Sequence, residues 1–227
     1  VGSFRGNIAH GYRVGFLAHD LDPKVFNPRY QASRRRDGWS GRFYMQVDDS
    51  PGMRRTAEFV DLFAYRNAEA GAIMANMGHL KITNFVSARN PSGLQTHLFR
   101  ADQWGEDDNG WNAPLVSDSL FVGGGSAEDE CGLSGPMSSW LTVSNTAFHG
   151  YATGSAPICA CELCGGTGKG GQELRTRALR FTEIAGARVR FRGQFEAILF
   201  DLDGSLTGHS RGWLHGLAPD GTIGHFP

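Results

Sequence analysis

A three-residue pattern returns along the chain: an apolar residue, a small or β-branched residue, and then Asn, Asp or Glu. Its copies are Phe59-Val60-Asp61, Ile82-Thr83-Asn84, Val116-Ser117-Asp118, Val143-Ser144-Asn145, Phe181-Thr182-Glu183 and a weaker Leu199-Phe200-Asp201. Asn67 and Asn90 repeat with nearly the same interval as the first two copies, and so do Gly71 and Gly93. Short strands that recur at irregular intervals of roughly 20–40 residues are typical of solenoids.

We therefore predict an all-β fold, a parallel β-helix or solenoid with long insertions at its corners. In such a fold alternate side chains point inward, and equivalent residues of successive coils lie over one another. Asn or Asp at a corner can satisfy backbone groups of the next coil. The prediction requires Asn84, Asp118 and Asn145 to lie in register on adjacent coils. The alternative is a β-sandwich whose strands share their composition by chance.

Composition supports a single β-rich domain over residues 1–227, with a Cys- and Gly-rich loop insertion at 150–175. Gly is abundant (32 residues), Phe numbers 15, and only 20% of residues are charged, which favours strands and turns over helices. The net charge of −1 gives no attraction toward nucleic acid, and no apolar run is long enough to span a membrane. The chain does not begin with Met, so we expect a piece of a longer protein or a mature product.

Four cysteines, Cys131, Cys159, Cys161 and Cys164, allow two interpretations. An even number suits disulfides formed in an oxidising compartment, with the pairing left open. Cys161 and Cys164 also fit one Cys-x-x-Cys-x-Gly-x-Gly unit of the DnaJ-type zinc domain, which pairs such units so that four thiolates surround each zinc ion. Because only one unit is present, we favour disulfides.

The stretch from Ala197 to Leu206 resembles the first motif of the haloacid-dehalogenase phosphatases, in which Asp201 would be the nucleophile and Asp203 the acid/base. That chemistry needs a doubly wound sheet and later strands, and the short Gly- and His-rich remainder after Gly208 does not supply them. Asp201, Asp203 and Ser205 could instead bind calcium through oxygen ligands. A turn, in which the Asp side chains accept hydrogen bonds from nearby amides, is the interpretation we favour, and we expect no other cofactor.

Three tryptophans in polar, Gly-rich stretches are candidates for carbohydrate binding: Trp39, Trp104 and Trp111. An exposed indole ring can cover the apolar face of a sugar while neighbouring polar groups bind its hydroxyls. The alternative is that these rings fold back over an open edge of the solenoid.

Four stretches, taken in order, resemble the β-helix region shared by fibrocystin-L, the cell-migration-inducing hyaluronan-binding protein and the cell-surface hyaluronidase (transmembrane protein 2). They are Phe4 to His10 (Phe-x-x-Asn-x-Ala-His), Phe59 to Gly71, Gly78 to Leu94, and Asp201 to Gly208 (Asp-x-Asp-Gly-Ser-x-Thr-Gly). The stretches lie within residues 1–94 and 195–212, and Gly11 replaces the Ser that is usual in the first. The resemblance implies a right-handed parallel β-helix in a large extracellular or cell-surface protein.

Two functions follow from the resemblance. The first is a structural or binding segment whose corner loops contact glycans or other extracellular protein chains. The second is a polysaccharide depolymerase similar to the hyaluronidase branch, with carboxylates and His10 in acid/base roles. No pair of carboxylates can be placed on one face from the sequence, so we favour the segment without enzyme activity and keep the depolymerase as the alternative. The phosphatase remains a remote third interpretation.

Overall fold

The computed structural model describes residues 4–19, 57–75, 80–96, 114–124, 129–135, 139–160, 172–191, 197–208, 212–217 and 222–226. All regular secondary structure in these residues is β-strand. The strands are β1 (Phe4–Arg5), β2 (Ile8–His10), β3 (Val14–His19), β4 (Ala57–Tyr65), β5 (Ala70–Ala75), β6 (Leu80–Ala88), β7 (Ser92–Thr96), β8 (Leu115–Ser117), β9 (Leu120–Val122), β10 (Cys131–Ser134), β11 (Ser139–Ser144), β12 (Ala147–Tyr151), β13 (Ala156–Ala160), β14 (Gln172–Arg177), β15 (Arg180–Ile184), β16 (Val189–Phe191), β17 (Ala197–Asp201), β18 (Gly212–Leu217) and β19 (Thr222–Phe226).

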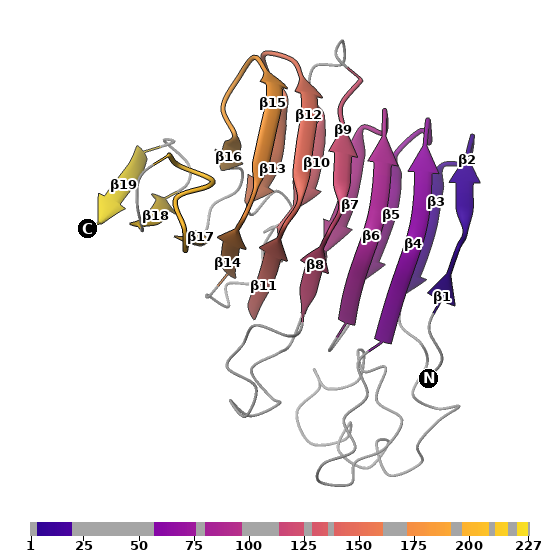
Figure 1. The fold of residues 1–227 in the computed structure, drawn as a ribbon. Coiled ribbons are helices and arrows are strands. Elements are labelled where there is room, and N and C mark those ends of the chain that lie inside the picture. The colour runs from indigo at the N-terminus through magenta and orange to yellow at the C-terminus, as the bar shows by residue number, and fades with distance from the viewer. Residues whose placement is uncertain are drawn as a thin grey trace, which may run out of the picture.

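The strands form two sheets that face each other. The first sheet has 13 strands and is joined through β4 and the long strand β6, which pairs with both β8 and β9. The second sheet has six strands in the order β16-β13-β10-β7-β5-β3. Every pairing is parallel except β17 with β18 and β18 with β19, which are antiparallel. Figure 1 shows the strands stacked side by side, with β1 and β2 at one end and β19 at the other.

One pass of the chain through both sheets makes one rung of this stack. The rungs are β1–β3, β4–β5, β6–β7, β8–β10, β11–β13 and β14–β16, and β17 begins a last partial one. Parallel strands in curled sheets, with no helix in the described part of the chain, are consistent with the predicted β-helix or solenoid. They differ from a β-sandwich, whose two sheets are antiparallel, and from the doubly wound sheet with helices that the phosphatase interpretation requires.

Equivalent corner residues lie in one column, as the sequence predicted. Asn84 lies level with Asp61 because Val60 pairs with Thr83 and Leu62 with Phe85. Asp118 and Asn145 continue the column, since Ser117 pairs with both Thr83 and Ser144. All four residues have positive φ, between 44° and 56°, a conformation that Asn and Asp tolerate better than most residues. The side-chain amides of Asn84 and Asn145 donate to the carboxylates of Asp61 (2.8 Å) and Asp118 (2.5 Å), respectively.

Two copies of the pattern lie outside this column. Thr182 pairs with His149, so Phe181-Thr182-Glu183 belongs to the next strand, β15, and the residue level with Asn145 is Ala178. Asp201 pairs with Thr176, so it lies two positions before the corner. The repeat of these letters has a physical cause: a second position on most rungs also has positive φ, and Glu183 (φ 55°) occupies that one.

The core consists of inward-pointing residues that stack on their equivalents in successive rungs. Phe121, Phe148 and Phe181 pair in register, and their rings stack at 5.2 Å and 5.4 Å between centroids. Asn67 and Asn90, whose repeat was predicted, form a buried ladder in which the side-chain oxygen of Asn90 accepts from the backbone N–H of Asn67 at 2.8 Å. Such a ladder satisfies polar groups that the bend would otherwise leave buried and unpaired.

Glycines form another column where the rungs approach closely. A Cβ on Gly71 would lie 2.6 Å from the carbonyl oxygen of Gly93, and a Cβ on Gly93 would lie 2.3 Å from that of Gly132. Neither Gly71 nor Gly93 needs a positive φ, so the requirement is the space alone. The predicted Gly71–Gly93 repeat thus marks a place where two backbones meet.

Candidate functional site

The predicted calcium or turn residues form a turn at the end of the parallel stack. Asp201 is only 2% exposed, and its carboxylate accepts hydrogen bonds from the backbone N–H of Leu206 (3.2 Å) and Thr207 (2.8 Å) and from the Thr207 hydroxyl (2.7 Å). Asp203 accepts from the N–H of Ala178 (2.7 Å) on the preceding rung and of Ser205 (3.0 Å). The Ser205 hydroxyl oxygen accepts from the N–H of Leu179 (2.9 Å).

These contacts direct the three side chains toward backbone amides. Partial burial alone would raise the pKa of Asp203, but the hydrogen bonds from Ser205 and from the Ala178 amide outweigh it and lower that pKa. The buried Asp201 carboxylate holds the turn that covers the core at this end, where Leu206 is buried. In the described residues no three His, Cys, Asp or Glu side chains are grouped as a metal site would require.

The cysteines contribute a disulfide on the second sheet. Cys131 in β10 bonds to Cys159 in β13, with 6.0 Å between their Cα atoms. Cys161 and Cys164 lie outside the described residues, as do all of residues 161–171 in the middle of the predicted insertion at 150–175. The rest of that range is described, and it includes the end of β12, all of β13 and the start of β14.

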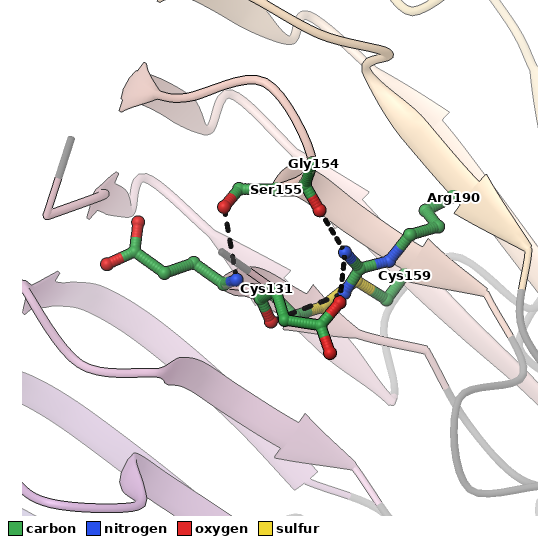
Figure 2. Close-up of polar contacts among 7 residues, drawn as sticks. Cys131, Gly154, Ser155, Cys159 and Arg190 are labelled. Carbon is green, nitrogen blue, oxygen red and sulfur yellow. Dashed lines mark hydrogen bonds and ion pairs between the residues drawn. A yellow bond between two sulfur atoms is a disulfide. The ribbon is translucent and has the colours of Figure 1, made fainter. Parts of the chain in front are cut away.

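Arg190 lies beside this disulfide (Figure 2). It is level with Cys159 on the next rung, and its guanidinium donates to the Cys159 sulfur at 3.5 Å. The same group donates to the carbonyl oxygen of Gly154 (2.6 Å) and to the carboxylate of Asp129 (3.1 Å). Disulfide and guanidinium together connect three successive rungs. Both sulfurs belong to buried residues, so the role of this cluster is structural: it holds adjacent rungs together.

A second buried carboxylate belongs to Glu130, between two rungs. Both of its oxygens accept from the N–H of Gly124 at 2.9 Å, and the residue is 4% exposed. Burial, and to a smaller degree the Glu130 charge, raises the pKa of Tyr151. Neither side chain is open to a substrate.

The surface that is open lies on the outer face of β2, β4, β6, β9 and β12. Residues of these strands that point away from the core form two columns, here called the apolar strip. The first column is Ile8, Phe63, Val86, Leu120 and Ala147, and the second is His10, Tyr65, Ala88, Val122 and His149. Each member lies level with its neighbours on adjacent rungs.

None of the strip residues is buried: Ile8 is 67% exposed, Phe63 is 36% exposed, and the others are exposed or half-buried. The rings at the N-terminal end of the strip stack on each other, with 4.6 Å between His10 and Tyr65 and 5.1 Å between Tyr65 and Phe63. Single exposed apolar residues are ordinary on a protein surface, but a contiguous apolar patch marks an interaction site.

Polar residues border the strip on both sides. The corner column of Asp61, Asn84, Asp118 and Asn145 runs along one border and is exposed. Along the other border lie Arg66 and Arg89, exposed residues with φ of 51° and 54° that follow Tyr65 and Ala88 directly. Where the strip ends, Arg180 and Thr182 replace its apolar residues on β15, and His149 contacts Thr182 (2.9 Å) and Glu183 (3.5 Å).

This strip is not among the sites predicted from the sequence. Its signal was present, because a stretch such as Leu62-Phe63-Ala64-Tyr65 has apolar or aromatic residues at consecutive positions, whereas a strand with one face in water usually alternates. Trp39, Trp104 and Trp111, the predicted sugar-binding residues, lie outside the described residues. His10 lies in the strip, stacked on Tyr65.

Among known proteins, the chain is similar in sequence to part of fibrocystin-L from human and mouse. The chain is 30% identical to the human protein over 163 residues and 32% identical to the mouse protein over 160 residues, in each case 63% of the chain. It spans only 4% of the length of either relative. No protein-family model matches the chain, and no solved structure does.

Among the described residues there is no helix of the length and apolarity that crossing a membrane requires. The resemblance to the hyaluronan-binding and hyaluronidase proteins stays a prediction, because it rests on motif letters alone. The two alignments with fibrocystin-L go further, and they support a relation of this chain to the fibrocystin-L family.

Proposed function

We propose that this chain is a stiff segment of a large cell-surface or extracellular protein, folded as a right-handed parallel β-helix, and that it contacts neighbouring protein chains through the apolar strip. The observation that carries the proposal is the continuity of the strip across five successive rungs of an in-register stack. Because every rung is hydrogen-bonded to the next, the strip is presented on a rigid surface.

Two observations support the large parent protein and its location outside the cell, one for each. Fibrocystin-L, to which the chain is related, is far longer than the chain, which suits a segment of a large protein. The Cys131–Cys159 disulfide fits an oxidising compartment, since disulfides are rare in reducing ones.

The chemistry of the strip favours a protein over a glycan. Val86, Leu120 and Val122 offer no hydrogen-bonding groups, whereas a sugar needs polar partners for its hydroxyls. Aliphatic side chains gain free energy when another apolar surface covers them. Glycan contact through Trp39, Trp104 and Trp111 remains the second proposal, and depolymerisation of a polysaccharide the alternative to both.

A dye that becomes fluorescent on apolar surfaces tests the contact surface. We expect the dilute protein to bind anilinonaphthalene sulfonate, and the variant Val86→Lys/Leu120→Lys to lose most of that fluorescence without a change in its circular dichroism. The matched control is Thr83→Lys, a substitution on β6 outside the strip. If the strip substitutions leave dye binding unchanged, the strip is not an open apolar surface and the proposal fails.

Incubation with size-defined hyaluronan and other polysaccharides, with and without a chelator, separates the remaining functions. We expect every polymer to keep its length. Shortening of a polymer would replace this proposal with the depolymerase, and binding without shortening would favour glycan contact.

A further inference from the structure

We propose that the apolar strip binds the same strip of a second copy of this chain, with the two stacks side by side and parallel. The inference rests on the proposed contact surface and adds the identity of its partner. Its basis is the arrangement of charge on the two borders of the strip.

The rungs of β4 and β6 differ in charge between their two borders: one border carries an arginine on both rungs, and the other is acidic on β4 and neutral on β6. On β4, Asp61 lies at one border and the residue after the strand, Arg66, at the other; on β6 the corresponding residues are Asn84 and Arg89. Asp118 extends the acidic border by one more rung. The side chains of Arg66 and Arg89 are exposed, and among the described residues neither forms an ion pair.

This polarity makes the strip complementary to itself in one orientation. A two-fold axis that lies in the contact plane and runs along the stack exchanges the two borders and keeps the rungs level. Arg66 of each copy then faces Asp61 of the other, and Arg89 faces Asn84. An axis across the stack would instead place one acidic border against the other. Because like charges oppose association and opposite charges favour it, the parallel arrangement is selected.

The apolar columns agree with the same orientation. The axis places the first column of one copy on the second column of the other, so Phe63 meets Tyr65 and Val86 meets the small Ala88. Offset aromatic contacts and large-against-small packing are the usual ways in which two sheet faces come together.

The size of the strip predicts a weak association. Five rungs extend roughly 20 Å along the stack, and the residues between the borders extend roughly 15 Å across it. The resulting face of roughly 300 Å² per copy is well below the about 800 Å² per partner of a standard stable interface. We therefore expect a dimer that forms at high concentration, or where many chains are held close together on one surface.

Sedimentation velocity over protein concentrations from about 5 to about 500 µM tests the inference, because mass action must shift the equilibrium. We expect the sedimentation coefficient of the wild type to rise toward that of a dimer, and dye binding per chain to fall over the same range. Val86→Lys/Leu120→Lys should remain monomeric. A gel run without reductant verifies that the dimer is not covalent.

A charge exchange tests the orientation. Asp61→Arg and Arg66→Asp should each weaken self-association at least tenfold, because each places like charges opposite one another twice. An equimolar mixture of the two variants should associate again, because the mixed dimer restores both pairs of opposite charge. Thermal unfolding of each variant verifies that the fold is retained.

Three results would overturn the inference. One is a wild type that stays monomeric throughout while its strip still binds the dye, which leaves the proposed contact surface intact and removes only the second copy. Another is a dimer that the strip substitutions do not affect. The third is a mixture of Asp61→Arg and Arg66→Asp that associates no better than either variant alone.

Discussion

Asp201 is the residue on which the end of the parallel stack depends. It lies at the end of an inward column that includes Ile82, Val116, Val143 and Thr176. A carboxylate there is stable because three donors from the following turn bind it. The turn thus replaces apolar packing as the means of closing the core.

Replacing Asp201 by Ala removes an acceptor from these donors while leaving them in place. We expect the variant to lose about 2–4 kcal/mol of unfolding free energy, because buried donors without partners cost more than a simple lost hydrogen bond. Urea denaturation measures the loss. Asp203→Ala is the matched control, since Asp203 is exposed, and should cost about 1 kcal/mol or less. Equal losses for the two variants would contradict the assigned role.

The residue pattern predicted one corner of the stack, but it did not distinguish that corner from a second corner of the same rung. Asp61, Asn84, Asp118 and Asn145 were found from the sequence because the left-handed conformation favours Asn and Asp. The same letters recur around Glu183, at the second positive-φ position of the rung, so spacing alone could not separate the two columns. Ala178, which occupies the first corner on its rung, carries none of the expected chemistry.

At the scale of elements, some neighbouring strands lie so close together that only glycine fits between their backbones. Gly93→Ala would place a Cβ 2.3 Å from the Gly132 carbonyl oxygen and 2.7 Å from the ring of Phe121. We expect a loss of about 3 kcal/mol or more, or a protein that does not fold, because both neighbours are part of packed elements. Thermal and urea unfolding measure the effect.

Gly135→Ala is the control for that substitution. Its Cβ would meet nothing closer than 3.6 Å, an ordinary contact, at a position that needs no positive φ. We expect a change within about 0.5 kcal/mol. A Gly93→Ala variant as stable as Gly135→Ala would show that β7 and β10 do not approach as described.

The disulfide joins two elements whose cysteines are 28 residues apart in sequence. Removing it with Cys131→Ala/Cys159→Ala should cost about 3–4 kcal/mol, chiefly because the unfolded chain regains the entropy of that loop. Unfolding by urea, with and without a reductant for the wild type, measures the cost. A loss under about 0.5 kcal/mol for the double variant would contradict a structural role for the bond.

The register between strands determines which residues form the outward strip, and the sequence alone does not give that register. Consecutive apolar residues in strands such as β4 signal that both faces are apolar, but they do not tell which residue lies on which face, because an apolar residue next to another fits either one. The register between β4, β6, β9 and β12 is what places Phe63, Val86, Leu120 and Ala147 in one column. Register depends on contacts between distant parts of the chain, so it becomes visible only in the folded molecule.

The whole molecule is a stack whose properties follow from repetition. Each rung contacts the rungs beside it, so stability adds rung by rung and a surface feature repeated on each becomes a continuous stripe. Ten side chains of ordinary size thus form one continuous surface, and that surface exists only if the rungs are in register.

Cross-linking of engineered cysteines tests that register most directly. The Thr83 and Ser117 hydroxyl oxygens lie 3.5 Å apart on adjacent rungs, and Thr83 and Ser144 lie two rungs apart. Adjacent parallel strands place paired Cα atoms about 4.8 Å apart, within the range of a disulfide, and strands two rungs apart lie beyond it. Under mild oxidation, Thr83→Cys/Ser117→Cys should form an intramolecular bond, identified by peptide mass spectrometry, and Thr83→Cys/Ser144→Cys should not. A bond in the second pair and none in the first would contradict the stacked register and everything built on it.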